Sequence, residues 1–176
     1  MTAIYLIRHA TPDTSGTHIP YDKYPGPPLS LKGEKEADRL GQFIQQETVV
    51  ELYHSPFARC KQTAQIISKI ARTTCIEDYA LREWGSNESE NDVNERLLPV
   101  IAAYTKKCSL IGSIGVVTHG GLIKLLLKMF RIEPSVLNEY QHMYESRSPL
   151  PPAGVWAVTM IKNKENESPK LVFVPD

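Results

Sequence analysis

Short apolar runs alternate along the chain with segments in which apolar residues recur every three or four positions. The runs have the length of β-strands, and the segments between them have the periodicity of amphipathic helices. The first run is apolar throughout, which is typical of a central strand buried on both faces. Strands are expected at four places before the C-terminal region: residues 2–7, 48–54, 73–78 and 113–118.

Helices are expected after each of these strands. The apolar faces of the first three consist of the following residues: Ala37, Leu40 and Ile44; Ala64, Ile67, Ile70 and Ala71; and Val93, Leu97, Val100, Ile101 and Tyr104. Ser30 precedes the first helix, where serine is a favoured N-cap. Asp92 and Glu95 resemble a capping box at the start of the third. A fourth helix, residues 120–130, is apolar almost all round and is therefore expected to be buried.

Proline-rich and polar segments mark the loops and the end of the sheet. Residues 17–28 contain four prolines and are expected to form a loop, as are the polar residues 85–95. Two further strands, at 154–161 and 170–174, flank a polar turn and predict an antiparallel hairpin. Strands that alternate with helices predict an α/β fold. We therefore expect one domain over residues 1–176, a three-layer α/β/α sandwich with a mostly parallel sheet and an antiparallel C-terminal edge hairpin.

Composition narrows the partners of the chain. Basic and acidic side chains number 20 each, so the formal net charge is zero. Binding to nucleic acid through its phosphates needs an excess of cations, and no run approaches the ~20 apolar residues of a membrane span. Neither nucleic acid nor membrane is therefore expected as a partner. Cys60, Cys75 and Cys108 form no CxxC pair and are expected to be reduced thiols of a cytoplasmic protein. Whether the chain forms a homodimer is left open.

Charged and imidazole side chains gather where the predicted strands end. The first strand runs into Arg8 and His9, and the fourth runs into His119. Arg59 begins the helix after the second strand, and Glu83 follows the third. In α/β folds, ligands bind outside the carboxyl ends of parallel strands. These five residues are therefore expected to form one site.

The same residues lie in motifs that resemble those of the histidine phosphatase superfamily, the phosphoglycerate mutase-like proteins. Arg8-His9-Ala10 resembles the opening R-H-G motif, and residues 55–64 resemble S-P-x-x-R-x-x-Q-T-A. Residues 28–40 resemble P-L-T-x-x-G-x-x-Q-A-x-x-L, and residues 116–127 contain the last motif, V-x-H-G-x. The motifs occur in the order that the family shows and cover most of residues 3–127.

The resemblance implies chemistry on a phosphate monoester. It assigns His9 the role of nucleophile, which would carry the phosphoryl group as phosphohistidine. It assigns Arg8 and Arg59 the binding of the phosphoryl oxygens, which suits planar guanidinium donors. Taken alone, each residue has an ordinary alternative: a packed histidine for His9, or a solvated helix residue for Arg59. The complete set favours the functional interpretation.

The remaining catalytic assignments concern the charge and the leaving group. His119 is expected to be protonated and to stabilise charge on the phosphoryl oxygens, with backbone N–H groups at Gly120 adding to the anion site. Glu83 is the expected general acid, with a pKa raised by burial and by the phosphate dianion. Ser15 falls where many members carry an asparagine that touches the phosphate, and it is a candidate contact.

Other features are less specific. His54 replaces a serine that is usual in the family, and either a place in the site or simple packing would explain it. Tyr21, Tyr24 and Trp84 could form a rim around the site or could be packing residues. The sequence contains no HExxH motif and no Cys/His cluster, so neither a metal nor another cofactor is expected.

The interval between Glu83 and His119 is short, with only 35 residues between them. Many family members carry a long helical insertion there that covers the site, so the resemblance implies a reduced lid here. An open site favours hydrolysis over isomerisation, because a mutase must keep water from its intermediate. We therefore expect a metal-independent phosphatase of the histidine acid phosphatase type, acting on a small phosphorylated metabolite. Residues 17–28 and 132–152 are expected to form the rim that selects it.

Three alternatives remain. A protein phosphohistidine phosphatase would fit the compact chain, but such enzymes typically lack the acid, and Glu83 argues against this alternative. Phosphoglycerate mutase activity is the second. The third is a non-catalytic module that binds a phosphorylated partner through Arg8 and Arg59, against which the complete set of catalytic residues argues.

Overall fold

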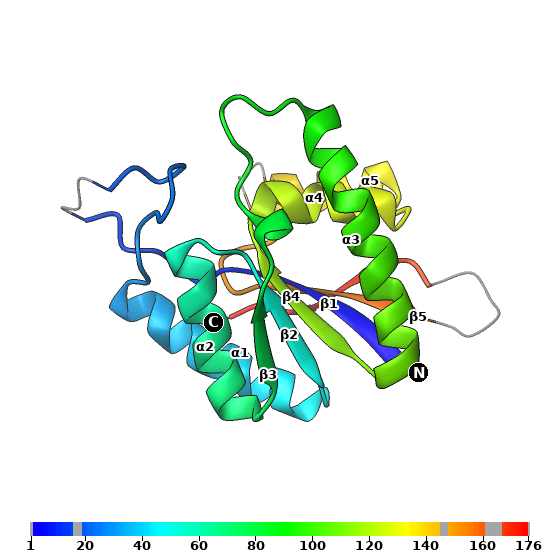
Figure 1. The fold of residues 1–176 in the computed structure, drawn as a ribbon, viewed down its shortest axis with the longest axis horizontal. Coiled ribbons are helices and arrows are strands. Elements are labelled where there is room, and N and C mark those ends of the chain that lie inside the picture. The colour runs from blue at the N-terminus through cyan, green and yellow to red at the C-terminus, as the bar shows by residue number, and fades with distance from the viewer. Residues whose placement is uncertain (1, 16–18, 145–147, 161–166, 176) are drawn as a thin grey trace.

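A single six-stranded sheet runs through the protein, with the strand order β3-β2-β4-β1-β5-β6 (Figure 1). The computed structural model describes residues 2–15, 19–144, 148–160 and 167–175. The strands are β1 (Thr2–Arg8), β2 (Glu51–His54), β3 (Thr74–Glu77), β4 (Ile114–Thr118), β5 (Val155–Met160) and β6 (Lys170–Phe173). The first four are parallel to one another, and β5 and β6 are antiparallel additions at one edge.

Helices cover both faces of this sheet. They are α1 (Leu31–Gln46), α2 (Ala58–Ala71), α3 (Glu90–Ile111), α4 (Gly120–Met129) and α5 (Pro134–Met143), with a short 3₁₀ helix η1 (Tyr79–Leu81). α1 and α2 pack on one face, and α3, α4 and α5 pack on the other (Figure 1). The predicted three-layer sandwich with a mostly parallel sheet is therefore confirmed.

The continuous apolar sequence of β1 follows from its place between the two helical layers. Ile4 and Leu6 belong to the core beneath α3 and α4, whereas Tyr5 and Ile7 belong to the core beneath α1 and α2. Because side chains alternate between the faces of a strand, a strand covered on both faces needs apolar residues at every position. Strand β1 is thus an inner strand, as the sequence predicts.

Helix α1 is fixed against the segment that follows β1. The side chain of Ser30 accepts a hydrogen bond from the N–H of Gly33 and donates one to the carbonyl of Thr11, so the predicted N-cap is confirmed. A Cβ atom on Gly33 would lie 2.0 Å from that carbonyl oxygen, and only glycine permits this approach. Glu36 then accepts hydrogen bonds from the backbone and the hydroxyl of Thr11. The chain just beyond His9 is therefore held by the first two turns of α1.

Two details of the sequence prediction are wrong, and one helix lies where none was predicted. The second strand begins at Glu51 rather than at residue 48, because Thr48 has a φ of 54°, in the left-handed region that no strand contains. The capping box of α3 is formed by Ser89 and Asp92, not by Asp92 and Glu95. Residues 132–152 were expected only as rim, yet they contain α5, which begins with Pro134 in its first turn.

The C-terminal hairpin is confirmed where the structure describes it. β5 pairs with β1, and β6 pairs with β5 as the edge strand, whereas most of the turn predicted between them lies outside the described residues. In the described part of the chain, no helix is long and apolar enough to cross a membrane.

Candidate active site

His9 and His119 lie side by side at the carboxyl edge of the sheet because β1 and β4 are paired neighbours. Arg8 is in register with Thr118, and the N–H of His9 donates to the carbonyl of Thr118 at 3.0 Å. Each histidine is the first residue after its strand, and the two ring centroids lie 5.5 Å apart. Strand pairing alone therefore brings together two residues that are 110 positions apart in the sequence.

The backbone fixes the tautomer of His9. Its Nδ1 lies 2.9 Å from the carbonyl oxygen of Ala10, which only accepts hydrogen bonds, so Nδ1 carries the proton and Nε2 carries the lone pair. Burial lowers the pKa of His9 well below its usual value, and the charge of Arg59 lowers it further. The imidazole is therefore neutral at pH 7, with Nε2 as a nucleophile.

Arg59 is the central cation of the site. Its side chain is fully buried, in the first turn of α2. One terminal nitrogen, Nη1, donates to the carbonyl of Tyr21 at 3.1 Å, and Nη2 donates to Oε2 of Glu83 at 2.8 Å. The guanidinium also lies 4.2 Å from the ring centroid of Tyr21 and 4.9 Å from that of Phe57. A buried charge needs such partners, and here every one of them belongs to the site or its border.

Glu83 completes a triangle with Arg59 and His119. Its Oε2 lies 3.0 Å from Nδ1 of His119, and Nδ1 lies 3.1 Å from Nη2 of Arg59. Burial alone would raise the pKa of Glu83, but the hydrogen bond from His119 and the charge of Arg59 lower it to about 2. The expected raised pKa is therefore wrong for the free protein, in which Glu83 is a carboxylate.

His119 is held by partners on both ring nitrogens. Nδ1 faces Glu83, and Nε2 lies 2.8 Å from the hydroxyl of Ser55, which in turn accepts from the N–H of Phe57. An Nδ1–H that donates to Glu83 and an Nε2 that accepts from Ser55 satisfy all of these contacts. Burial lowers the pKa of His119, and this outweighs the raising effect of Glu83. His119 is therefore neutral in the free protein, and its expected protonation beside a bound phosphoryl group stays a prediction.

Arg8 reaches the same cluster from the end of β1. Its Nη1 donates to the carbonyl of Leu150 at 2.9 Å, and a Cβ atom on Gly120 would lie 3.4 Å from its Nε. Burial lowers the pKa of Arg8, whereas the neighbouring Tyr21 and the carboxylate of Glu83 raise it. Gly120 is thus close to the cluster, as the sequence predicts, and its lack of a side chain leaves room for Ser148, whose hydroxyl would be 2.3 Å from a Cβ.

Two buried donors in the site have no hydrogen-bond partner. They are Nε of Arg8 and Nε of Arg59, two of the three such side-chain atoms in the described part of the chain. A buried guanidinium N–H without a partner costs free energy, so its persistence favours a site built to receive an anion. The sequence predicts the same anion-binding role for both arginines.

The loop that carries Glu83 is braced from α3. Arg96 donates through Nε and Nη2 to the carboxylate of Glu88, and through its terminal nitrogens to the carbonyls of Ala80 and Arg82. The indole of Trp84 donates to the carbonyl of Glu88 at 2.8 Å. These bonds on both sides of Glu83 fix its position, and the sequence prediction included neither Arg96 nor Glu88.

Other predicted positions are placed outside the cluster. Ser15 is exposed, and its hydroxyl and N–H both bond to Oδ1 of Asp13, so the structure does not bring it to the two histidines. His54 is buried, and its Nδ1 donates to the carbonyl of Ser55 at 2.8 Å, which is a packing arrangement. Tyr21, by contrast, lies inside the site, whereas Tyr24 is 70% exposed and packs edge-on against Phe57.

Cys60 lies directly behind His119. Its sulfur is 3.6 Å from Nε2 of the imidazole, and the side chain is fully buried. Burial raises the pKa of this thiol, so it is neutral and unreactive in the folded protein. The sequence predicts only a reduced thiol at Cys60. Its place in the floor of the site depends on tertiary packing, which the spacing of residues along the chain does not show.

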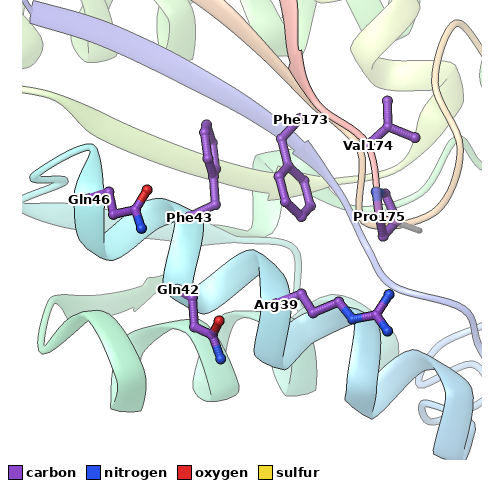
Figure 2. A pocket seen from close by; sticks show the side chains of 7 residues that line it. All are labelled: Arg39, Gln42, Phe43, Gln46, Phe173, Val174 and Pro175. Carbon is purple, nitrogen blue, oxygen red and sulfur yellow. The ribbon is translucent and has the colours of Figure 1, made fainter.

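No metal-binding cluster is found among the described residues. A separate hollow of about 320 Å³ lies between α1 and the C-terminal strand, away from the two histidines (Figure 2). It is lined by Arg39, Gln42, Phe43, Gln46, Phe173, Val174 and Pro175. The rings of Phe43 and Phe173 stack at 4.9 Å within it. Its lining offers no group suited to nucleophilic attack, so the strand-end cluster remains the candidate site.

Comparison with known sequences matches the N-terminal half of the chain. Residues 4–90 match the profile of the histidine phosphatase superfamily (branch 1). Over 90 residues the chain is 30% identical to a protein of Bacillus subtilis (strain 168) described as the uncharacterized phosphatase PhoE. This match covers 50% of the chain and 46% of that protein. The chain thus aligns with about half the length of this relative.

Solved structures extend the similarity of the fold to the whole chain. A mycobacterial glucosyl-3-phosphoglycerate phosphatase, in complex with VO₃, superposes with a TM-score of 0.73 at 17% identity, over 100% of both chains. Phosphoglycerate mutase from Bacillus anthracis superposes with a TM-score of 0.70 at 17% identity, over 89% of this chain and 87% of the other. At these identities the comparisons show a shared fold.

Proposed function

Because residues 4–90 place the chain in the histidine phosphatase superfamily, we propose that it is a metal-independent phosphomonoesterase that forms a phosphohistidine on His9. One observation carries this proposal. The neutral Nε2 of His9 stands beside two largely buried arginines, each with an unpartnered Nε. Phosphoryl transfer requires a nucleophile with a fixed lone pair beside guanidinium donors that can bind the phosphoryl oxygens.

The first step is an exchange of anions. In the free protein, Oε2 of Glu83 accepts from Arg59 and His119, which are donors that a phosphoryl oxygen would also use. When a phosphate monoester binds there, Glu83 loses its contacts with His119 and Arg59, which lower its pKa, and gains a dianion as its neighbour. Both changes raise that pKa. Substrate binding therefore converts the carboxylate of Glu83 into the acid that the reaction needs.

The chemical steps follow from this arrangement. The lone pair on Nε2 of His9 attacks phosphorus, the P–O ester bond breaks, and Glu83 gives its proton to the departing oxygen. Water then attacks phosphorus, the N–P bond breaks, and Glu83 takes the proton of that water. Inorganic phosphate leaves, and His9 is neutral again. Charge on the transferring group is stabilised throughout by Arg8, Arg59 and His119.

Hydrolysis is favoured over isomerisation by the short segment between Glu83 and His119. It consists of the braced loop, α3 and β4, and buried residues such as Val93 and Leu97 commit α3 to the core. A chain segment used to build the core is not free to close over an intermediate, and exclusion of water is what a mutase needs. Incubation with 3-phosphoglycerate and bisphosphoglycerate tests this point, because efficient isomerisation would contradict it.

A second candidate is a phosphohistidine phosphatase, and the ionisation of Glu83 favours it. A phosphoramidate leaving group depends less on a general acid, so a carboxylate with a pKa of about 2 would not hinder its hydrolysis. The two functions differ in their response to Glu83→Gln. The substitution should slow hydrolysis of an alkyl phosphate strongly, but should leave hydrolysis of a phosphohistidine peptide nearly unchanged.

The direct test is hydrolysis of p-nitrophenyl phosphate in the presence of EDTA, followed by a panel of metabolite phosphates. The natural protein should hydrolyse the ester with EDTA present, and the His9→Ala variant should not. Rapid mixing with the aryl phosphate should also give a phosphorylated peptide that contains His9. Turnover that requires a divalent metal, or that survives in His9→Ala, would refute the proposal.

A further inference from the structure

Tyr21 is in contact with each of three site residues. Its hydroxyl lies 3.3 Å from Nε2 of His9, and the same side chain raises the pKa of the neighbouring Arg8. Its ring lies over the guanidinium of Arg59 at 4.2 Å, and its carbonyl accepts from Nη1 of Arg59. The residue is 40% exposed, so it contributes little to the core.

The direction of these hydrogen bonds is fixed by chemistry. Nδ1 of His9 donates to the carbonyl of Ala10, so Nε2 accepts, and the hydroxyl of Tyr21 is its donor. The guanidinium of Arg8, whose pKa Tyr21 raises, offers only donors to the phenol oxygen. The hydroxyl of Tyr21 thus covers the lone pair that attacks phosphorus and faces one of the cations that would hold the phosphoryl group.

A phosphoryl group cannot bind productively while the hydroxyl stays there. Attack requires phosphorus about 3–3.5 Å from Nε2 along its lone pair, and the phenol oxygen already lies 3.3 Å away. Tyr21 belongs to the loop between β1 and α1 and is partly open to solvent. Its ring can therefore shift while it remains stacked on Arg59.

Resting on the proposed function, we propose that Tyr21 is a phosphoryl-binding residue: its hydroxyl covers Nε2 of His9 in the free protein and donates to a phosphoryl oxygen when substrate binds. The stack on Arg59 keeps the phenol within reach of the oxygens that Arg59 binds. The exchange replaces a long hydrogen bond to an imidazole with a charge-assisted bond to a phosphoryl oxygen, which is the stronger of the two.

The test uses Tyr21→Phe, which keeps the ring over Arg59 and removes only the hydroxyl. Two measurements are made on the natural protein and the variant. One is the affinity for inorganic phosphate by calorimetry, and the other is the rate at which diethyl pyrocarbonate modifies the peptide containing His9. We expect phosphate to bind about tenfold more weakly and His9 to be modified several-fold faster. Tyr21→Leu, which also removes the stack, should weaken phosphate binding further.

The control is Tyr24→Phe, which removes a hydroxyl from an exposed side chain of the same loop. It should change neither measurement. If either phosphate affinity or His9 modification is the same in Tyr21→Phe as in the natural protein, the proposal on Tyr21 is overturned. Failure of the proposed function would give a different result, because the natural protein would then hydrolyse no phosphate ester. The phosphate affinity and the rate of His9 modification would still show whether Tyr21 binds phosphate and covers His9.

Discussion

The site has two halves that are built in different ways. His9 and His119, the strand-borne half, follow directly from β1 and β4 and are placed by backbone pairing. Glu83 and Tyr21, the loop-borne half, lie outside the strands and are placed by side-chain contacts, with Arg59 bonded to both. The strand-borne half is fully buried, whereas the loop-borne half is partly exposed.

The difference separates reaction chemistry from access. A nucleophile needs a fixed direction for its lone pair, and paired strands supply that rigidity. The groups that must yield their contacts to a substrate lie on loops, where local rearrangement costs less. Both Glu83 and Tyr21 occupy hydrogen-bond positions that a phosphoryl group would take. On the proposed function, the loop-borne half therefore contacts the nucleophile and the terminal nitrogens of Arg59 until substrate binds, while the Nε donors of both arginines stay unpartnered.

The largest effect is expected from breaking the strand-borne half. His9→Gln removes the nucleophile and should lower kcat for p-nitrophenyl phosphate by about 10³-fold or more. His142→Gln, which changes an exposed histidine in the last turn of α5, should have no effect. Retention of a tenth of the activity in His9→Gln would show that the covalent step does not use this residue.

A smaller and substrate-dependent effect is expected from the loop-borne half. Glu83→Gln cannot supply a proton, so kcat for an alkyl phosphate should fall by about 10²-fold. For p-nitrophenyl phosphate, whose leaving group needs little protonation, the loss should be tenfold or less. Parallel kinetics on the two esters check the contrast. Equal losses on both would mean that Glu83 acts by positioning rather than as an acid.

A smaller loss of kcat is expected from changing Arg96, which holds the loop that carries Glu83. Arg96→Met removes the bonds to Glu88 and to two carbonyls, so the loop should loosen. We expect kcat for the alkyl ester to fall about tenfold and the free energy of unfolding to fall by about 1–2 kcal/mol. Lys106→Met, at an exposed position on the same helix, is the matched control. A stability loss without the kinetic loss would assign Arg96 to the fold alone.

The smallest effect concerns the dependence of stability on pH. Burial lowers the folded-state pKa of His9 well below 6.5, so below that pH the unfolded chain binds a proton that the folded chain does not. The contribution of a neutral His9 to the free energy of unfolding is therefore fully present above about pH 6.5 and is lost as the pH decreases. His9→Gln should reduce this dependence between pH 6 and 5 by about 1.4 kcal/mol per pH unit, one proton. Urea unfolding at both pH values measures it, and an unchanged slope would contradict a neutral, buried His9.

Much of the strand-borne half could be predicted from the sequence. Apolar runs mark the strands, and the strands deliver Arg8, His9 and His119 to one edge whatever the surrounding loops do. The fold class follows from the same alternation of strands and helices. The start of α2 likewise predicted the place of Arg59, because the motif fixes its distance from the end of β2.

The rest depends on contacts between distant segments, which a pattern does not contain. The ionisation of Glu83 follows from its contacts with Arg59 and His119, and the motif contains no sign of either bond. The helix α5 was not predicted, because it is short and places only a few apolar side chains, Val136, Leu137 and Tyr140, against the core. The cap of α3 was misplaced by three residues because Ser89 and Asp92 offer a second box that only the fold selects.

The position of Cys60 makes it possible to measure how often the floor of the site opens. A thiol reagent cannot reach a fully buried sulfur 3.6 Å behind an imidazole unless the floor of the site opens. The labelling rate of Cys60 in the natural sequence therefore times that opening. The half-exposed Cys75, which needs no such opening, supplies the reference rate in the same experiment. A bound anion that holds His119 and Arg59 in place should slow the labelling of Cys60 and leave the labelling rate of Cys75 unchanged.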